Sequence, residues 1–280
     1  MRREFWERVR DNTGGLPAHL DRSVMLADLS SHLSSPDPRW REDVALVLLS
    51  RWILRQGLQD TERRSLAQNA IEGLSAGLGR ASDDSVFLRS YSTLVLCAIV
   101  ERDLIHPFLR SVEYRRILSS ALRLLDREKD LRGFVPGKGW AHTLAHLADL
   151  FDSLVKSPHL QDQDLQRILK SIAKRLLRPT STVLGYGEPV RLAKAVITLL
   201  NREIVPIPYI NSWIDSLSQS SKGRRWSEVD DNPGDVRART NVTLFLSALV
   251  ILTRVKGAHK SKARAAQFAL KALRQISEGF

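Results

Sequence analysis

The apolar residues of this chain recur at intervals of three and four rather than alternating with polar ones. Ile168, Ile172 and Leu176 form one such series, and residues 244–250 contain another. A period near 3.6 residues places these side chains on one face of a helix. No alternating run makes a convincing strand, and the chain has no Asn-Gly or Asp-Gly turn of the kind that closes a β-hairpin. The pattern therefore predicts an all-α fold.

Capping residues and prolines indicate where the helices begin. Asp, Asn and Ser side chains cap the first turn, and proline is tolerated at the first helical position. Acidic residues there also suit the positive end of the helix dipole. The expected starts are Asp37-Pro38 (a helix to about Gln56), Ser82-Asp83-Asp84 (to about Arg102), Pro107, Gly139, Asp162, Glu188-Pro189 and Asn232-Pro233.

The expected architecture is a series of packed helical hairpins. About a dozen helices of roughly 12–22 residues with short loops must pack as antiparallel neighbours. Helix pairs at intervals of about 40–50 residues are typical of degenerate helical repeats. The prediction is an all-α, HEAT- or armadillo-like superhelix, with a compact irregular bundle as the alternative. We find no domain boundary, so residues 1–280 are expected to form a single domain, and residues 218–225 are the clearest loop.

Composition supports a globular chain in a reducing compartment. Hydrophobic residues make up 43% of the 280 positions, too many for a disordered chain. The one cysteine, Cys97, lies in an apolar run and is interpreted as a small buried hydrophobe. The longest apolar run, residues 242–252, is too short for a membrane span, and the N-terminus lacks the apolar stretch of a signal peptide. We therefore expect a cytoplasmic protein with no membrane span.

The net charge of +12 makes nucleic acid a candidate partner. One predicted helix carries a basic stripe of Arg167, Lys170, Lys174 and Arg178, with Arg175 beside it. The C-terminal segment adds Arg254, Lys256, Lys260, Lys262, Arg264, Lys271 and Arg274. Such stripes could hold a phosphate backbone in a salt-dependent way. The alternative is a solvated surface, because no base-readout motif accompanies the charges.

The most unusual segment runs from residue 132 to residue 150. A glycine-rich turn containing Lys138 leads into a helix expected to start at Gly139. At about 100° per residue, His142, His146 and Asp149 fall within roughly 60° of one another on that helix. Trp140 is expected on the opposite, buried side with several leucines.

Three interpretations of this polar stripe stay open. It could be a polar seam between helices, or line a ligand groove where imidazole transfers protons near neutral pH. It could also bind a metal through two imidazoles and a carboxylate, although Thr143 replaces the glutamate of the usual His-Glu-x2-His motif. Backbone N–H groups at the helix start, with Lys138 beside them, could receive a phosphate or carboxylate. A glycine turn that only reverses the chain is the alternative, and the spacing is not that of a Walker loop.

Other polar residues are candidates for the same surface. Glu188 and Arg191 are neighbours on a predicted helix, Arg89 precedes an apolar run, and Asn241 lies in the last strongly apolar helix. If the helices line an inner surface, these residues could converge there with His142, His146 and Asp149. The alternative is a set of ordinary surface ion pairs, which contribute little.

Two segments of the chain are similar to a known signature. Residues 137–142, Gly-Lys-Gly-Trp-Ala-His, followed by residues 145–150, Ala-His-Leu-Ala-Asp-Leu, resemble an uncharacterised bacterial helical family, domain of unknown function 2785. Residues 89–92 and 188–193 are similar to its weaker blocks, and the resemblance extends from about Trp40 to Leu252. It implies a helical-repeat fold and carries no assigned reaction.

The leading functional hypothesis is a binding module whose polar groove holds an anionic small molecule or a segment of a partner protein. One alternative is an enzyme with histidine acid–base chemistry, either a hydrolase or a protein resembling helical-repeat DNA glycosylases. Glycosylases need aromatic residues facing the groove, so the expected burial of Trp140 counts against that version. Nonspecific nucleic-acid binding is the other alternative. The sequence identifies no cofactor and no definite metal.

Overall fold

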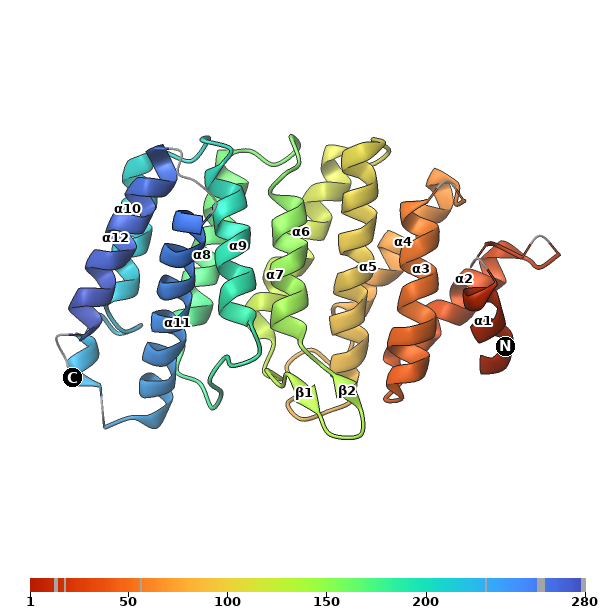
Figure 1. Cartoon of the computed structure of the whole chain (residues 1–280), viewed down its shortest axis with the longest axis horizontal. Helices are drawn as coiled ribbons and strands as arrows, with labels where there is room; N and C mark the ends of the chain where they lie inside the picture. The colour runs from red at the N-terminus through yellow and green to blue at the C-terminus, as the bar shows by residue number, and fades with distance from the viewer. Residues whose placement is uncertain (13–14, 18, 56, 230, 256–259, 278–280) are drawn as a thin grey trace. The chain divides into compact units, whose positions relative to one another are not determined.

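The computed structural model describes the chain except for residues 13–14, 18, 56, 230, 256–259 and 278–280. The described chain is all-α, as predicted, with one very small sheet (Figure 1). Its α-helices are α1 (Arg3–Asp11), α2 (Arg22–Ser31), α3 (Val47–Leu54), α4 (Asp60–Gly73), α5 (Ser85–Ile105), α6 (Ser111–Arg127), α7 (Thr143–Leu154), α8 (Asp162–Leu177), α9 (Glu188–Leu200), α10 (Ile207–Asp215), α11 (Pro233–Val255) and α12 (Lys260–Ser277). A π-helix, η2 (Arg39–Leu46), precedes α3, and the strands are β1 (Phe134–Val135) and β2 (Gly139–Trp140).

The chain divides into two compact units. Unit 1 is Met1–Leu150 and unit 2 is Phe151–Phe280, so the division falls inside α7. The single-domain organisation and the HEAT-like superhelix stay predictions.

Unit 1 is built around α5. This helix packs against α3, α4 and η2, and its side chains are buried almost all the way round. A helix that is apolar on every side is stable only when other elements cover it. Its start agrees with the sequence prediction, because the Asp83 carboxylate accepts a hydrogen bond from the Ser85 N–H at 2.8 Å. Helix α5 therefore provides a fixed wall for the segments that lie on it.

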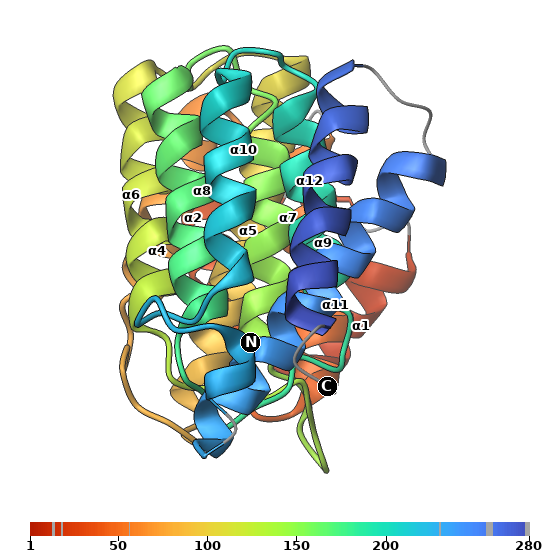
Figure 2. The same ribbon diagram turned by 90° about the vertical axis from the view of Figure 1, so that its left-hand side faces the viewer.

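Unit 2 is centred on α11, which packs against α8, α9 and α12. Figure 2 shows α8, α10 and α12, and α10 contacts both α8 and α12. Residues Pro233–Arg254 of α11 are long and apolar enough to span a membrane by composition alone, but 56% of that window is buried inside the protein. Such burial is typical of a core helix and makes the composition weak evidence for a membrane span.

The capping signals locate most helix starts correctly. Helices α8, α9 and α11 begin at Asp162, Glu188 and Pro233, as predicted. The helix expected at Pro107 begins instead at Ser111. The reason is local, because the Asp103 carboxylate accepts hydrogen bonds from the N–H groups of both Phe108 and Leu109 at 2.6 Å.

The helix expected at Gly139 begins at Thr143, and the expectation of no strand was wrong. Residues 134–135 and 139–140 pair as an antiparallel β-hairpin, with Phe134 opposite Trp140. The predicted loop at residues 218–225 is confirmed as a turn, closed by a bridge between Gln219 and Arg225.

Candidate functional site

The β-hairpin of unit 1 is held by side chains from two other elements. The Trp140 N–H donates to Glu42 Oε1 of η2 at 3.3 Å, and the Trp140 carbonyl accepts from the Tyr91 hydroxyl of α5 at 3.1 Å. The Lys138 carbonyl accepts from an Arg41 guanidinium nitrogen at 2.6 Å. Burial raises the pKa of Tyr91 well above its usual range, so this hydroxyl stays a neutral donor. Both backbone groups of Trp140 are therefore fixed.

Arg41 connects η2 to the hairpin. Its side chain is fully buried, with Cζ 4.0 Å from the Phe87 ring centroid and 4.8 Å from that of Tyr91. A desolvated guanidinium over aromatic faces is a favourable cation–π contact. Further hydrogen bonds join it to the Ser35 carbonyl and the Glu42 carboxylate, both at 2.6 Å. Arg41 and Glu42, the two η2 side chains that bind the hairpin, lie in a π-helix. This conformation is found frequently at functional sites.

Gly139 is required by this close approach. Its φ of +76° lies in the left-handed region that favours glycine. A Cβ there would lie 2.7 Å from Glu42 Oε1 and 3.0 Å from the Cβ of Pro38. The hairpin can approach η2 only because position 139 has no side chain.

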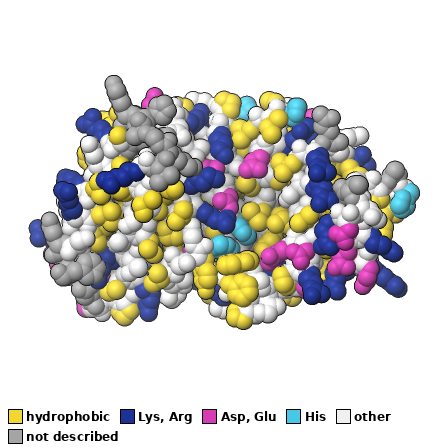
Figure 3. Space-filling view, in the orientation of Figure 1, with side chains coloured by type: hydrophobic (Ala, Val, Ile, Leu, Met, Phe, Trp, Pro, Cys, Tyr) yellow, Lys and Arg dark blue, Asp and Glu magenta, His cyan; other side chains and the backbone are white. Residues whose placement is uncertain are grey.

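Five rings form a continuous series from the surface into the core of unit 1, which we call the aromatic row: Phe134, Trp140, His142, His146 and Tyr91. Successive ring centroids are 5.2, 4.9, 5.6 and 5.5 Å apart, and the Trp140 and His142 rings are stacked. Phe134 is 48% exposed and Trp140 37%, whereas Tyr91 is 2% exposed. Figure 3 shows hydrophobic side chains gathered over the hairpin with histidine beside them.

The prediction that Trp140 is buried was therefore wrong. The helical projection assumed a helix from Gly139, but Trp140 lies in β2, where it pairs with Phe134. Both residues of that pair are exposed, while their neighbours Val135 and Gly139 are buried. The leucines expected in the core, Leu144, Leu147 and Leu150, are buried as predicted.

His142 is not part of the helix on which it was predicted. It precedes α7 with a φ of +51°, a conformation that costs a non-glycine residue about 1–2 kcal/mol. Its carbonyl accepts the first hydrogen bond of α7, from the His146 N–H at 3.1 Å. The two imidazoles are still neighbours, but they are 7% and 8% exposed rather than facing an open groove.

His146 is oriented by a buried serine. Its Nδ1 lies 2.8 Å from Ser90 Oγ, and the same hydroxyl also hydrogen-bonds to the Ala141 carbonyl. A hydroxyl has one hydrogen, so if Ser90 donates to the carbonyl, Nδ1 must carry the proton and donate to Ser90. Because Ser90 is fully buried, this pair fixes a ring and does not present a nucleophile to solvent.

The geometry does not support the interpretation of His142, His146 and Asp149 as a metal site. Asp149 follows His146 by three residues on α7 and is half-buried. Among the residues described, no group of three His, Cys, Asp or Glu side chains is placed to hold a metal ion.

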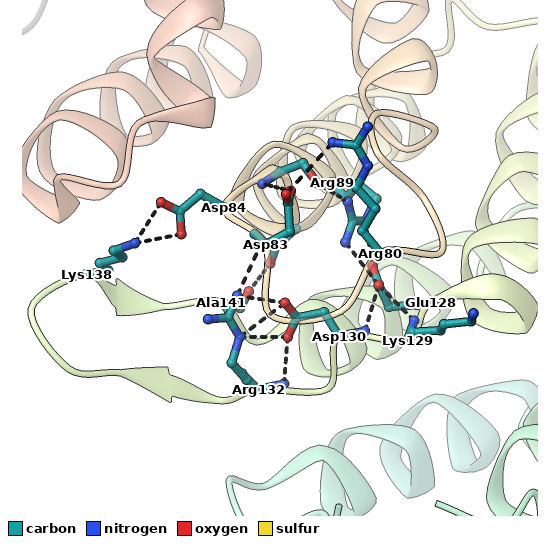
Figure 4. A network of polar contacts seen from close by, with 12 residues as sticks. Arg80, Asp83, Asp84, Arg89, Glu128, Lys129, Asp130, Arg132, Lys138 and Ala141 are labelled. Atoms are coloured by element: carbon teal, nitrogen blue, oxygen red, sulfur yellow. Dashed lines mark hydrogen bonds and ion pairs between the residues drawn. The ribbon is translucent and has the colours of Figure 1, made fainter. Parts of the chain in front are cut away.

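Lys138 lies in the hairpin turn and not at the start of α7, so the prediction that it lies beside the N-terminus of that helix was wrong. Its Nζ is 2.7 and 2.8 Å from the two carboxylate oxygens of Asp84 (Figure 4). The alternative interpretation, a glycine turn that reverses the chain, describes the segment.

Arg89 is part of a buried network of polar contacts at the segment that leads into the hairpin (Figure 4). Its guanidinium is fully buried and donates to both carboxylate oxygens of Glu128, at 2.6 and 3.0 Å, and to the Ala76 carbonyl at 2.7 Å. Glu128 also accepts from the N–H groups of Lys129 and Asp130, each at 2.9 Å. A ligand could reach Arg89 only by displacing Glu128.

Glu188, Arg191 and Asn241 lie in unit 2, around the loop that precedes α9. The Asn241 amide accepts from the Leu184 N–H at 2.8 Å and donates to the Thr182 carbonyl at 3.0 Å. The buried Glu188 carboxylate accepts from the Tyr186 N–H at 2.9 Å, and Arg191 is half-buried. Convergence of these residues with those of unit 1 stays a prediction.

The predicted basic stripe is present on the surface of α8. Arg167, Lys170 and Lys174 are exposed, while Arg178 at the helix end is half-buried. In the C-terminal segment Arg254, Arg264, Lys271 and Arg274 are exposed. Lys256 and the side chains of Lys260 and Lys262 lie outside the described part of the chain.

The sequence prediction missed the residues that hold and extend the site. Arg41, Glu42 and Tyr91 come from segments far from the hairpin in sequence, and no local pattern connects them to it. Phe134 had a usable signal, because it and Trp140 flank the turn-forming pair Pro136-Gly137, which is a hairpin pattern.

A family model described as "Protein of unknown function (DUF2785)" matches residues 74–251, well over half of the chain. The chain belongs to this family. The match confirms the DUF2785 resemblance but begins at residue 74, not at about Trp40. It includes the hairpin and α7, whereas η2 lies before it. No curated protein and no solved structure matches the DUF2785 chain significantly.

Proposed function

We propose that unit 1 of this DUF2785 protein is a binding module that takes a segment of a partner protein on the exposed end of the aromatic row. The observation that carries the proposal is that Trp140 combines a fixed backbone with an exposed side chain. Its backbone is fixed on both sides, yet its indole is over a third exposed and lies between the rings of Phe134 and His142. Large aromatic side chains held rigidly at a surface are typical anchors of protein interfaces.

The charges around the hairpin favour a protein segment over an anionic small molecule. Two of the three cations predicted for the binding surface lie in unit 1, and both already have acidic partners, since Arg89 is paired with Glu128 and Lys138 with Asp84. The Lys138 pair is about 40% exposed and could exchange partners, but the Arg89 pair is buried. What the site offers to a ligand is therefore mainly ring surface.

The same contacts argue against the enzyme alternative. The imidazoles are nearly buried, and the hydroxyl nearest to His146 is fully buried. General acid–base catalysis requires a group within hydrogen-bond reach of the substrate. A structural and recognition role for the histidines accounts for the stacking of His142 on Trp140 and the edge-to-face contact of His146 with Tyr91.

The test is peptide selection followed by affinity measurement. Peptides selected from a displayed random library against the wild-type protein should bind at least about tenfold more weakly to Trp140→Ala, because anchors of this kind contribute about 2 kcal/mol or more. Phe134→Ala should weaken the same peptides less, since Phe134 contacts the row at one end.

The matched control is Ile105→Ala, which removes a 68% exposed side chain at the end of α5 in the same unit. Its affinity for the selected peptides should stay within about twofold of wild type. The proposal is wrong if no peptide is enriched, or if a folded Phe134→Ala/Trp140→Ala protein binds the enriched peptides as tightly as wild type.

A further inference from the structure

Helix α6 of unit 1 carries a second surface, which the basic stripes found in the sequence do not include. Its exposed arginines, here called the α6 arginine face, are Arg115, Arg116, Arg123 and Arg127. At about 100° and 1.5 Å per residue they cover an arc of about 120° and a length of about 18 Å. The opposite face, with Tyr114, Ile117, Leu118, Ala121, Leu124 and Leu125, is buried in the protein. Figure 2 shows α6 at the edge of unit 1.

Within the described residues, none of these four arginines forms an ion pair. The arginines near the start of α6 behave differently, since Arg110 and Arg64 lie 3.2 and 3.3 Å from the Glu113 carboxylate. The α6 arginine face therefore concentrates four positive charges, with the half-buried Asp126 as the one acidic residue of α6 within the same arc.

Helix stability does not account for this arrangement. Only Arg127 lies in the last turn, where a cation suits the negative end of the dipole. Arg115 and Arg116 lie in the second turn, nearer the positive end. Arg123 and Arg127 are like charges at a spacing of four, which destabilises an isolated helix by about 0.2–0.5 kcal/mol. The face is better explained by an external anion.

We propose that the α6 arginine face binds the phosphate backbone of duplex nucleic acid without reading its sequence. Guanidinium groups bind phosphate oxygens in pairs of hydrogen bonds, which favours arginine over lysine at such sites. A duplex presents a phosphate about every 3.4 Å on each strand, so a face about 18 Å long faces several phosphates. The chain's net charge of +12 adds long-range attraction.

An acidic membrane surface fits this face less well. Helices that lie on membranes combine basic residues with a broad apolar face that enters the lipid. On α6 the apolar face is buried in the protein, and Val112 is the exposed large hydrophobic residue of the helix. Charge without insertable apolar surface favours the nucleic acid.

The experiment measures binding of the full-length protein to a fluorescent 20-base-pair DNA of arbitrary sequence at several salt concentrations. Wild type should bind with a log–log salt slope of about −3 to −4, as expected for about four phosphate contacts. The triple variant Arg116→Ala/Arg123→Ala/Arg127→Ala should bind at least about tenfold more weakly, with a slope shallower by about 2–3.

Two charge-matched variants locate the effect. Arg39→Ala/Arg55→Ala/Lys222→Ala removes three exposed charges from separate elements and should change affinity less than about threefold. Arg167→Ala/Lys170→Ala/Lys174→Ala tests the α8 stripe in the same assay. Equal losses in the α6 and scattered variants, or a loss confined to the α8 variant, would overturn the proposal.

Binding to vesicles that contain phosphatidylserine tests the membrane alternative. Tight binding to these vesicles without binding to DNA would assign the face to a membrane and contradict the proposal. A wild-type affinity for DNA that is undetectable even at low salt would also contradict it. Because neither probe involves the aromatic row, these outcomes are independent of peptide binding at the hairpin.

Discussion

The loops that precede α7 and α9 are both held by side chains from another helix of their own unit, but they differ in how many side chains are used. Arg41, Glu42 and Tyr91 each hold a backbone group of the hairpin before α7. In the loop before α9, one side chain from another helix, Asn241, holds two backbone groups. The first loop is also supported by the buried Arg89–Glu128 pair.

The difference indicates what each loop is for. The loop before α9 is fixed by few contacts, mainly the Asn241 amide and the Glu188 carboxylate. The larger set of contacts around the hairpin fixes one particular residue, Trp140, and leaves its ring exposed. Holding an exposed aromatic side chain in one orientation lowers the entropy lost when a partner binds, which is useful for recognition and unnecessary for chain reversal.

The largest expected effect comes from removing the buried ion pair at the start of the loop that contains the hairpin. Arg89→Met should destabilise the protein by about 3–5 kcal/mol, because it leaves the buried Glu128 carboxylate without its guanidinium. Urea unfolding of the variant and wild type measures this difference. Arg167→Met, an exposed arginine on α8 with a loose 3.5 Å contact to Asp164, is the control and should cost less than about 1 kcal/mol.

The second prediction compares one glycine from each loop. Gly187, before α9, has a φ of +90° and open space where a Cβ would be, so Gly187→Ala should cost about 1–2 kcal/mol of backbone strain. Gly139→Ala should cost about 1–3 kcal/mol more, because its Cβ also meets Glu42 and Pro38. Equal losses of unfolding free energy in the two variants would show that η2 does not pack against Gly139 as closely as described.

The smallest expected effect is in the loop of unit 2. Asn241→Ala removes two hydrogen bonds and should lower the unfolding free energy by about 1–2 kcal/mol. It should leave the affinity of hairpin-binding peptides unchanged. A loss of peptide binding in a folded Asn241→Ala protein would show that the two loops act together, as the convergence hypothesis requires.

The helices could be predicted from the sequence because their signals are local. Asp162, Glu188 and Pro233 begin helices where capping chemistry places them, and the apolar period gives their buried faces. The α6 arginines are equally visible once that helix is recognised. The helix at Pro107 was misplaced by four residues because Asp103, in the preceding helix, captures two backbone N–H groups.

The candidate site could be predicted only in part. The unusual composition of residues 132–150 marked the segment, and the two histidines are neighbours as expected. The surroundings of the histidines could not be predicted, because the helical projection assumed that α7 begins at Gly139. In the structure, residues 139–140 form a strand paired with residues 134–135. That pairing depends on contacts with residues nearly 50 and 100 positions away in the chain, Tyr91 and Glu42.

The sequence by itself determined that the chain is helical, where most helices begin, and which segment is chemically unusual, since helix periodicity and capping act over a few residues. Only the tertiary structure decided that Trp140 is exposed, that Arg89 and Lys138 already have acidic partners, and that His142 lies outside the helix. Those outcomes depend on Glu42 of η2, on Tyr91 of α5, and on Asp84 and Glu128 in the loops next to α5 and α6. Burial and ion pairing are properties of neighbours in space, and local spacing along the chain does not specify them.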